Sequence, residues 1–184
     1  VSGIENIYWL SEFETVFKDV ATNSDGIYLN SNEHLRADPI VETRDRRFID
    51  QCKKDYPLHS YERLAPIMHK LRSVKDPVEI EIMKEACSIT HKAFRRIMKF
   101  IKPGVNEYEV EAEIVHEFLK NGSRGPAYAP IIAGGFNSCV LHYVENDKVL
   151  KDGQIILMDF GAEYANYASD MTRCLPVNGR FSDR

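Results

Sequence analysis

The stretch IILMDFGAEYANYASDMTR, residues 155–173, predicts a β-hairpin with one aspartate in each arm. If the arms pair about a turn centred on Tyr164 and Ala165, Asp159 lies directly opposite Asp170. Side chains that oppose each other in this way share one face of the sheet, with Cβ atoms about 5 Å apart, and like charges there are destabilising. Two acids held so close need a cation or a shared proton between them. The pattern therefore predicts a metal site at Asp159 and Asp170.

Each aspartate also has a structural explanation. An acid at the end of a strand, next to a glycine such as Gly161, is typical of a turn in which the side chain satisfies nearby backbone groups. For either aspartate alone this explanation is the better one. The pairing of the two favours the metal site.

A histidine precedes the hairpin, in the segment Cys139 to Asn146, which we expect to lie one strand upstream of the two acids. A histidine in an apolar stretch is more often a hydrogen-bonded core residue than a ligand or catalyst. From this position His142 could also reach the same cleft as a hydrogen-bond partner or proton carrier. The spacing alone leaves both possibilities open.

In these segments the chain resembles the aminopeptidase P family, the manganese-type Xaa-Pro aminopeptidases with the pita-bread fold. The resemblance runs from Asp76 to Phe181. The matching segments are Gly134 to Asn137, Leu141 to Tyr143 with Glu145 and Asn146, Asp159 to Tyr164, and Asp170 to Arg173 continuing into Pro176 to Gly179. His142, Asp159 and Asp170 have the order and spacing that the family's motifs require.

The resemblance implies a metallopeptidase that removes an N-terminal residue when proline follows it. It implies that Asp159 and Asp170 are metal ligands, with Asp170 bridging two divalent ions, Mn²⁺ first among the candidates, which hold a hydroxide nucleophile. It also implies that His142 is catalytic and contacts the substrate and the tetrahedral intermediate. The family's remaining ligands, one histidine and two glutamates, belong to a second half, and the sequence stops at Arg184 before them. We therefore expect this chain to be inactive alone.

Three alternatives remain within the same fold. A non-catalytic pita-bread protein used as a binding or chaperone module is one, because a fold does not fix a function. Such a protein is expected to have lost the ligands, and both aspartates are present. Creatinase works without metal, so the retained acids also count against it. Prolidase, which acts on Xaa-Pro dipeptides, fits less well because the segments around His142 and Pro176 are nearer to aminopeptidase P.

The expected fold class is α+β. Residues 71–184 are expected to form the first half of a pita-bread catalytic domain, with helices packed on a curved mixed or antiparallel sheet. Asp76, Pro77 and Glu79 have the spacing of a helix start, and a second start follows at Asn106. Residues 1–70 are expected to be the C-terminal part of an α/β domain.

Composition and charge exclude some classes of partner. The formal net charge is −4, without a basic stripe for nucleic acid. No apolar run approaches the roughly 20 residues that span a bilayer. The four cysteines include no Cys-x-x-Cys pair, which is typical of a reducing compartment, so we expect a cytoplasmic protein and leave a homo-oligomer possible. Half of a two-fold core is expected to expose the strand of Ile155, Ile156 and Leu157 or its neighbours. The chain is then expected to aggregate, to associate through that face or to fold only in part.

Overall fold

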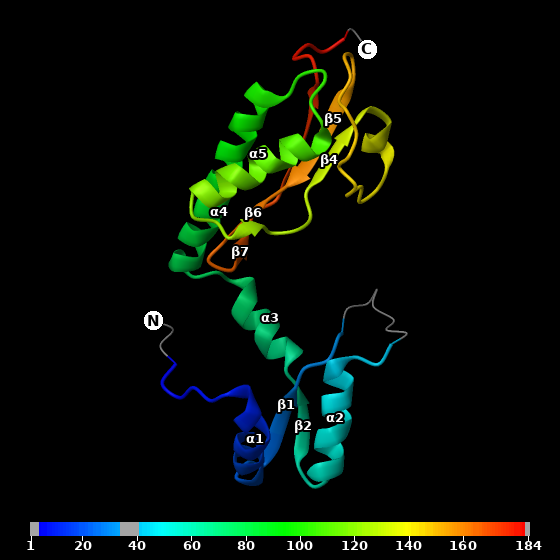
Figure 1. Ribbon diagram of the computed structural model, residues 1–184. Coiled ribbons are helices and arrows are strands. Elements are labelled where there is room, and N and C mark those ends of the chain that lie inside the picture. Colours follow the sequence, from blue (N-terminus) through cyan, green and yellow to red (C-terminus); the bar gives the residue numbers. More distant parts are fainter. Residues whose placement is uncertain (1–3, 34–40, 183–184) are drawn as a thin grey trace. The chain divides into compact units, whose positions relative to one another are not determined.

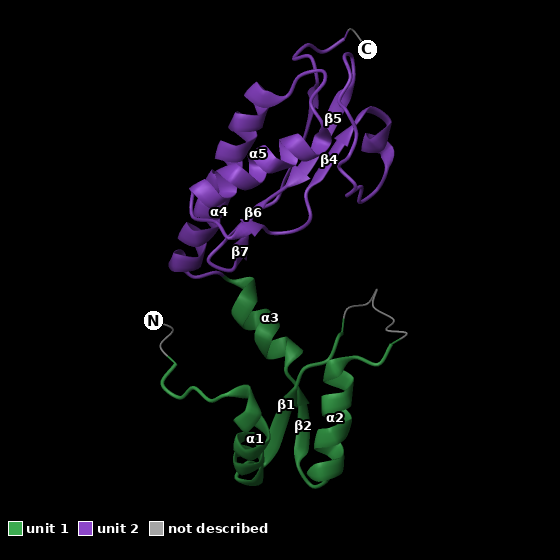
Figure 2. Ribbon diagram, viewed as in Figure 1, with its two compact units in different colours: residues 1–74 green, residues 75–184 purple. Residues whose placement is uncertain are grey.

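The computed structural model describes residues 4–33 and 41–182 and divides into two compact units, Val1–Val74 and Lys75–Arg184 (Figure 1 and Figure 2). Among the described residues, no helix has both the length and the apolar character needed to cross a membrane. The predicted site residues all lie in unit 2.

Unit 1 is a short βαβ arrangement with helices beside a two-stranded sheet. Its elements are η1 (Leu10–Glu12), α1 (Phe13–Thr22), β1 (Gly26–Leu29), α2 (Arg44–Asp55), β2 (Ser60–Arg63) and α3 (Ala65–Ser73). Strands β1 and β2 are parallel, and α2 lies between them in the sequence. Between α1 and α2, the ring of Phe17 contacts Phe13, Phe48 and Tyr56 at centroid distances of 5.2 to 6.0 Å. These aromatic contacts hold the two helices together.

Unit 2 begins with two long helices and continues into two small sheets. Its elements are α4 (Pro77–Phe100), α5 (Glu107–Lys120), β3 (Gly125–Pro126), β4 (Ile131–Gly134), η2 (Gly135–Cys139), β5 (Ile155–Phe160), β6 (Ala162–Tyr164), β7 (Tyr167–Ala168) and β8 (Met171–Pro176). Both helix starts predicted from the sequence are confirmed, because capping boxes join Asp76 to Glu79 and Asn106 to Glu109. Each box satisfies backbone N–H groups that the first helical turn leaves free.

The sheets of unit 2 are antiparallel, in the orders β4-β5-β8 and β3-β6-β7. Helices α4 and α5 lie along one side of the strands (Figure 1). The core between helices and sheet contains Ile89 and Ile97 of α4, Ile114 of α5, and Ile156 and Met158 of β5, all with no exposed surface. The α+β fold class is confirmed. The opposite face of β5, which carries Asp159, is therefore the face turned away from this core.

The register of the hairpin differs from the predicted one. Asp159 pairs with Thr172, not with Asp170, and the turn falls at Ala165 and Asn166. Both turn residues have positive φ, +48° and +67°, as in the tight two-residue turns that suit the twist of a hairpin. The turn lies one residue later than predicted, so every opposed pair is shifted by two.

The expected exposure of the strand of Ile155 to Leu157 is only partly observed. Ile155 is 38% exposed and Leu157 is half-buried, but Ile156 is fully buried against the helices. The expectation was wrong for Ile156 because α4 and α5 cover that face of the sheet within the chain itself.

Candidate metal centre

The two predicted metal ligands lie on the same face of the hairpin as diagonal neighbours. Asp159 opposes Thr172, and Asp170 stands two residues before Thr172 along the same arm. Residues two apart on a strand share a face, and such diagonal neighbours across a pair are within reach of each other's side chains. The shifted register thus leaves Asp159 and Asp170 together while it removes their direct opposition.

A tyrosine that the sequence analysis missed joins the two carboxylates. The hydroxyl of Tyr128 donates to Oδ1 of Asp159 at 2.6 Å and lies 3.0 Å from Oδ1 of Asp170. The backbone N–H of Ala127 donates to the carbonyl of Gly161 at 2.8 Å, which fixes the segment of Tyr128 beside the hairpin. Burial and the two carboxylates raise the pKa of Tyr128 well above its usual value. Its hydroxyl therefore stays a donor at neutral pH.

The donors present fit a divalent cation. A phenol has one hydrogen, so the hydroxyl of Tyr128 cannot fully satisfy two carboxylates, and no ion pair to Asp159 or Asp170 occurs within residues 4–33 and 41–182. Two negative charges that share one hydroxyl favour a cation between them. Carboxylate oxygens suit hard ions such as Mg²⁺ and Mn²⁺. In the described parts of the chain, no group of three or more His, Cys, Asp and Glu side chains could hold a metal ion.

The hairpin is fixed behind the aspartates by two buried hydroxyl groups. The hydroxyl oxygens of Thr90, on α4, and Ser169 are 2.6 Å apart, and the N–H of Ala162 donates to them at 2.9 and 3.0 Å. The two strands approach closely here, since a Cβ on Gly161 would lie 1.7 Å from the carbonyl oxygen of Ser169. Because Ser169 precedes Asp170, helix α4 helps to place that aspartate.

His142 does not lie on a strand, contrary to the prediction. It follows η2, in a turn, with a φ of +54°, and its side chain is exposed. In the described part of the chain, no hydrogen bond joins His142 to Asp159 or Asp170. The structure brings the two aspartates together with Tyr128 but leaves the proposed catalytic role of His142 a prediction.

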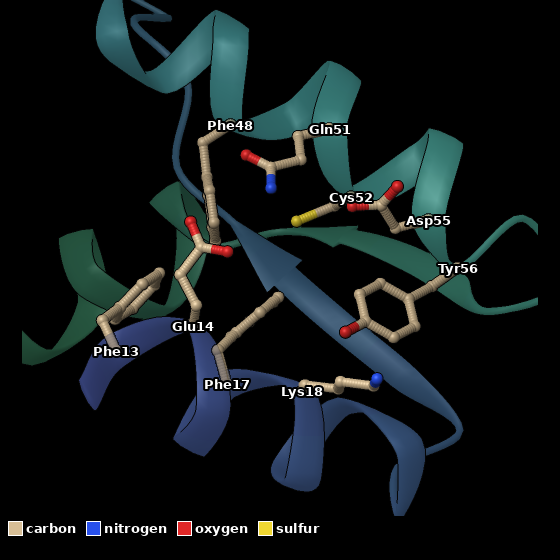
Figure 3. Close-up of a pocket in the computed structure, with 9 residues that line it drawn as sticks. All are labelled: Phe13, Glu14, Phe17, Lys18, Phe48, Gln51, Cys52, Asp55 and Tyr56. Atoms are coloured by element: carbon tan, nitrogen blue, oxygen red, sulfur yellow. The ribbon is translucent and has the colours of Figure 1, made fainter. Parts of the chain in front are cut away.

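A separate hollow occurs in unit 1, between α1 and α2 (Figure 3). Its volume is about 340 Å³. The lining residues are Phe13, Glu14, Phe17, Lys18, Phe48, Gln51, Cys52, Asp55 and Tyr56. The aromatic side chains that line the hollow contact one another and form the packing between the two helices. None of the predicted site residues lines it.

Comparison with known proteins gives concordant matches. The model of metallopeptidase family M24 matches residues 81–184. The Xaa-Pro aminopeptidase of Haemophilus influenzae is 37% identical over 180 residues, which are 98% of this chain and 40% of that protein. The Xaa-Pro aminopeptidase of Escherichia coli is 35% identical over 182 residues, 98% of this chain and 41% of that protein. The chain thus spans less than half the length of the relatives it matches.

Solved structures agree with these sequence matches. The aminopeptidase PepP of Pseudomonas aeruginosa aligns with 98% of this chain and 41% of its own length, at a TM-score of 0.82 and 34% identity. An Escherichia coli aminopeptidase P variant in complex with substrate aligns at a TM-score of 0.79 and 35% identity, over 98% of this chain and 41% of its own. A zinc-substituted form of the Escherichia coli enzyme has also been solved in complex with product.

Proposed function

The chain belongs to metallopeptidase family M24, and from this premise we propose that it is part of an aminopeptidase that releases the N-terminal residue from peptides with proline second. Relatives named Xaa-Pro aminopeptidase match nearly the whole chain and support this reaction. Residues 71–184 would be the first half of the catalytic domain, and residues 1–70 the end of the preceding α/β domain.

The observation that carries the proposal is the cluster of Tyr128, Asp159 and Asp170. Two acids on one face of a hairpin, joined by a single hydroxyl, are arranged for a cation and not for mutual packing. A turn former needs neither the second acid nor the tyrosine. The cluster therefore supports a metal-dependent hydrolase over a non-catalytic module.

Each residue of the site has a distinct role in the proposed reaction. Asp159 and Asp170 would supply carboxylate ligands to two divalent ions. Tyr128 orients both carboxylates by its hydroxyl, as residues behind metal ligands commonly do. His142 is exposed and would donate a hydrogen bond to the substrate carbonyl oxygen, which gains negative charge as the carbonyl carbon becomes tetrahedral.

Divalent ions held by these residues, for which Mn²⁺ is our candidate, would supply Lewis-acid activation of the scissile carbonyl and of the attacking water. The two carboxylates of this chain supply part of the ligand set. We propose that the remaining ligands lie outside the 184 residues, so that the chain alone gives no turnover and binds Mn²⁺ weakly. Turnover of a Xaa-Pro-Xaa peptide by the isolated chain would contradict this.

The test is made in the full-length protein that carries this sequence. Asp159→Asn and Asp170→Asn are expected to abolish turnover of a Xaa-Pro-Xaa peptide and to lower the bound metal, measured by plasma emission spectroscopy. His142→Ala is expected to keep the metal and lower kcat. Asp152→Asn is the control, since the side chain of Asp152 accepts a hydrogen bond from Asn178 in a surface turn, away from Asp159 and Asp170. Loss of metal in the His142 variant would refute this division of roles.

Two further measurements refine the proposal. Cleavage of Xaa-Pro dipeptides in preference to longer peptides would favour a prolidase. The cytoplasmic location is proposed from the cysteine pattern, and fractionation of the native cells tests it.

A further inference from the structure

Glu107, the first residue of α5, is a buried carboxylate that accepts four hydrogen bonds. Its side chain has no exposed surface. Oε1 accepts from the N–H of Gly134 at 2.8 Å and from Nδ2 of Asn137 at 3.2 Å. Oε2 accepts from the hydroxyl of Tyr143 at 2.7 Å and from the N–H of Lys148 at 3.1 Å. Four donors fill the hydrogen-bonding capacity of a carboxylate.

All four donors belong to residues 134–148, the segment that carries His142. Gly134 ends β4, Asn137 lies in η2, Tyr143 follows His142 directly, and Lys148 closes the segment. One carboxylate therefore restrains the start, the middle and the end of the segment. The amide of Asn137 also donates to the hydroxyl of Tyr143 at 2.9 Å, which links two of the donors to each other.

The segment needs such restraint. Residues 143–148 form no helix or strand. His142 has a φ of +54°, a backbone conformation that residues with a Cβ adopt uncommonly, although histidine tolerates it better than most. Asn146 fixes the later part, since its side chain contacts the N–H of Ile132 and the carbonyl of Pro130. In the described part of the chain, the side-chain hydrogen bond that lies next to His142 in the sequence is the one that Tyr143 donates to Glu107. Burial and Glu107 raise the pKa of Tyr143, so this donor persists at neutral pH.

We propose that Glu107 is a positioning residue that sets the place of the His142 imidazole through Tyr143 and Asn137. This rests on the proposed function, in which His142 contacts the substrate. A carboxylate whose only role was to cap α5 would accept from the free backbone N–H groups of the first turn of that helix. The bonds from Asn137 and Tyr143 are side-chain bonds from the histidine segment, and they have no part in the cap, which Asn106 and Glu109 form.

The first arm of the test uses the full-length protein and requires no activity. Glu107→Gln replaces one carboxylate oxygen with an NH₂ group. Each carboxylate oxygen accepts from two donors, so in either orientation the NH₂ group faces two donors and leaves them without an acceptor. We expect faster hydrogen exchange at the amides of Gly134 and Lys148, and a shift of the His142 imidazole signals in ¹⁵N NMR. Glu113→Gln is the control, because Glu113 lies on the same helix and pairs with Arg96 of α4. Unchanged His142 signals in a folded Glu107→Gln chain would overturn the proposal.

The second arm uses the full-length protein and a double-mutant cycle. Glu107→Gln is expected to lower kcat about 10- to 100-fold with the metal content unchanged, since small misplacement of a catalytic group has effects of this size. In a His142→Ala background the same change is expected to have no further effect on kcat. An equal loss in both backgrounds would mean that Glu107 acts without His142 and would overturn the proposal.

A gentler variant guards against failure to fold. Tyr143→Phe removes one donor and keeps the ring, and it is expected to shift the His142 signals in the same direction as Glu107→Gln. No shift would overturn the proposal. If His142→Ala leaves turnover intact, the proposed function fails for that residue, while the exchange and NMR arm still decides whether Glu107 holds the segment.

Discussion

At the scale of single residues, Gly161 lies where the two arms of the hairpin approach too closely to leave space for a side chain. A Cβ there would lie 1.7 Å from a backbone carbonyl oxygen, so Gly161→Ala must separate the strands. We expect it to lower the free energy of unfolding of unit 2 by about 3 kcal/mol or more, the upper range for overpacking. Gly153→Ala is the control: its φ is +75° but nothing lies within 4 Å, so about 1 kcal/mol is expected. Equal losses in urea unfolding would contradict the close approach.

The hydroxyl of Tyr128 provides a second residue-scale prediction. Tyr128→Phe removes the donor that Asp159 and Asp170 share, so the carboxylates are held less firmly for a metal. We expect about a 10-fold loss of Mn²⁺ affinity in the full-length protein, within the range for residues behind metal ligands. Electron paramagnetic resonance of free Mn²⁺ measures it. Tyr108→Phe, at an exposed position on α5, should change nothing, and equal affinity in both variants would refute the role of Tyr128.

The sequence contains a local signal for the position of the turn but none for the contact of Tyr128 with the aspartates. Within the run from Ala162 to Ala168, Asn166 is the residue that best tolerates positive φ, and it lies in the observed turn. Asn166 limits a two-residue turn to Ala165–Asn166 or Asn166–Tyr167, and the first of these is the observed turn. The contact of Tyr128 with Asp159 joins positions 31 residues apart and has no local pattern. Its only signal is its place in the stretch Ser123 to Pro130, which is rich in glycine, proline and small residues and is typical of a loop.

At the scale of elements, the start of α4 is linked to the tip of the hairpin. Glu79 accepts from the N–H of Asp76 and from the hydroxyl of Tyr167 on β7. These hydrogen bonds, that from Tyr167 foremost, lower the pKa of Glu79 below its ordinary value of 4.5. A carboxyl whose pKa is lowered by folding stabilises the fold above its unfolded pKa and loses this contribution as pH falls through its folded pKa.

Glu79→Gln should therefore reduce the loss of stability on acidification below pH 4.5. The measurement is the free energy of unfolding in urea at pH values from 6 downward to about 3, which brackets the titration of glutamate. Glu81→Gln is the control, because Glu81 pairs with Lys84 on the exposed side of the same helix. If the free energy of unfolding of Glu79→Gln depends on pH in the same way as that of the original chain and of Glu81→Gln, the ionisation of Glu79 is not coupled to folding.

The segment of His142 shows why some elements escape sequence analysis. Its apolar residues suggested a strand, but a strand needs a neighbour that accepts its N–H groups. Here the N–H of Val140 donates to the carbonyl of Asn137, and the N–H of Val144 donates to the side chain of Glu145. The hydroxyl of Tyr143 donates to Glu107, which is 36 residues away. The helices α4 and α5, by contrast, carry their start signals within four residues, and both were predicted correctly. The sequence therefore predicts elements that are set by neighbouring residues, such as helix starts, but not segments that depend on side-chain partners far away in the sequence.

At the scale of the whole molecule, the apolar surface is distributed unevenly. Unit 2 has a continuous core of buried residues from α4, α5 and the sheet. In unit 1, large apolar side chains at the start of the chain are exposed, among them Tyr8 at 58%, Trp9 at 80% and Leu10 at 81%. They continue along α1 through Phe13, Val16 and Val20, beside a hollow that these residues line. Contiguous exposed apolar patches of this kind favour association.

We therefore predict that the 184-residue chain associates through the surface of Trp9, Leu10 and α1, in preference to the strand of Ile155. Leu10→Ser should shift the chain toward monomer in size-exclusion chromatography with light scattering. Leu58→Ser is the control, since Leu58 is 98% exposed in the same unit but lies outside the patch. Trp9 is the only tryptophan, so its emission should move to shorter wavelength as concentration rises. A chain that remains monomeric at every concentration, or an equal effect of both substitutions, would show that this surface does not drive association.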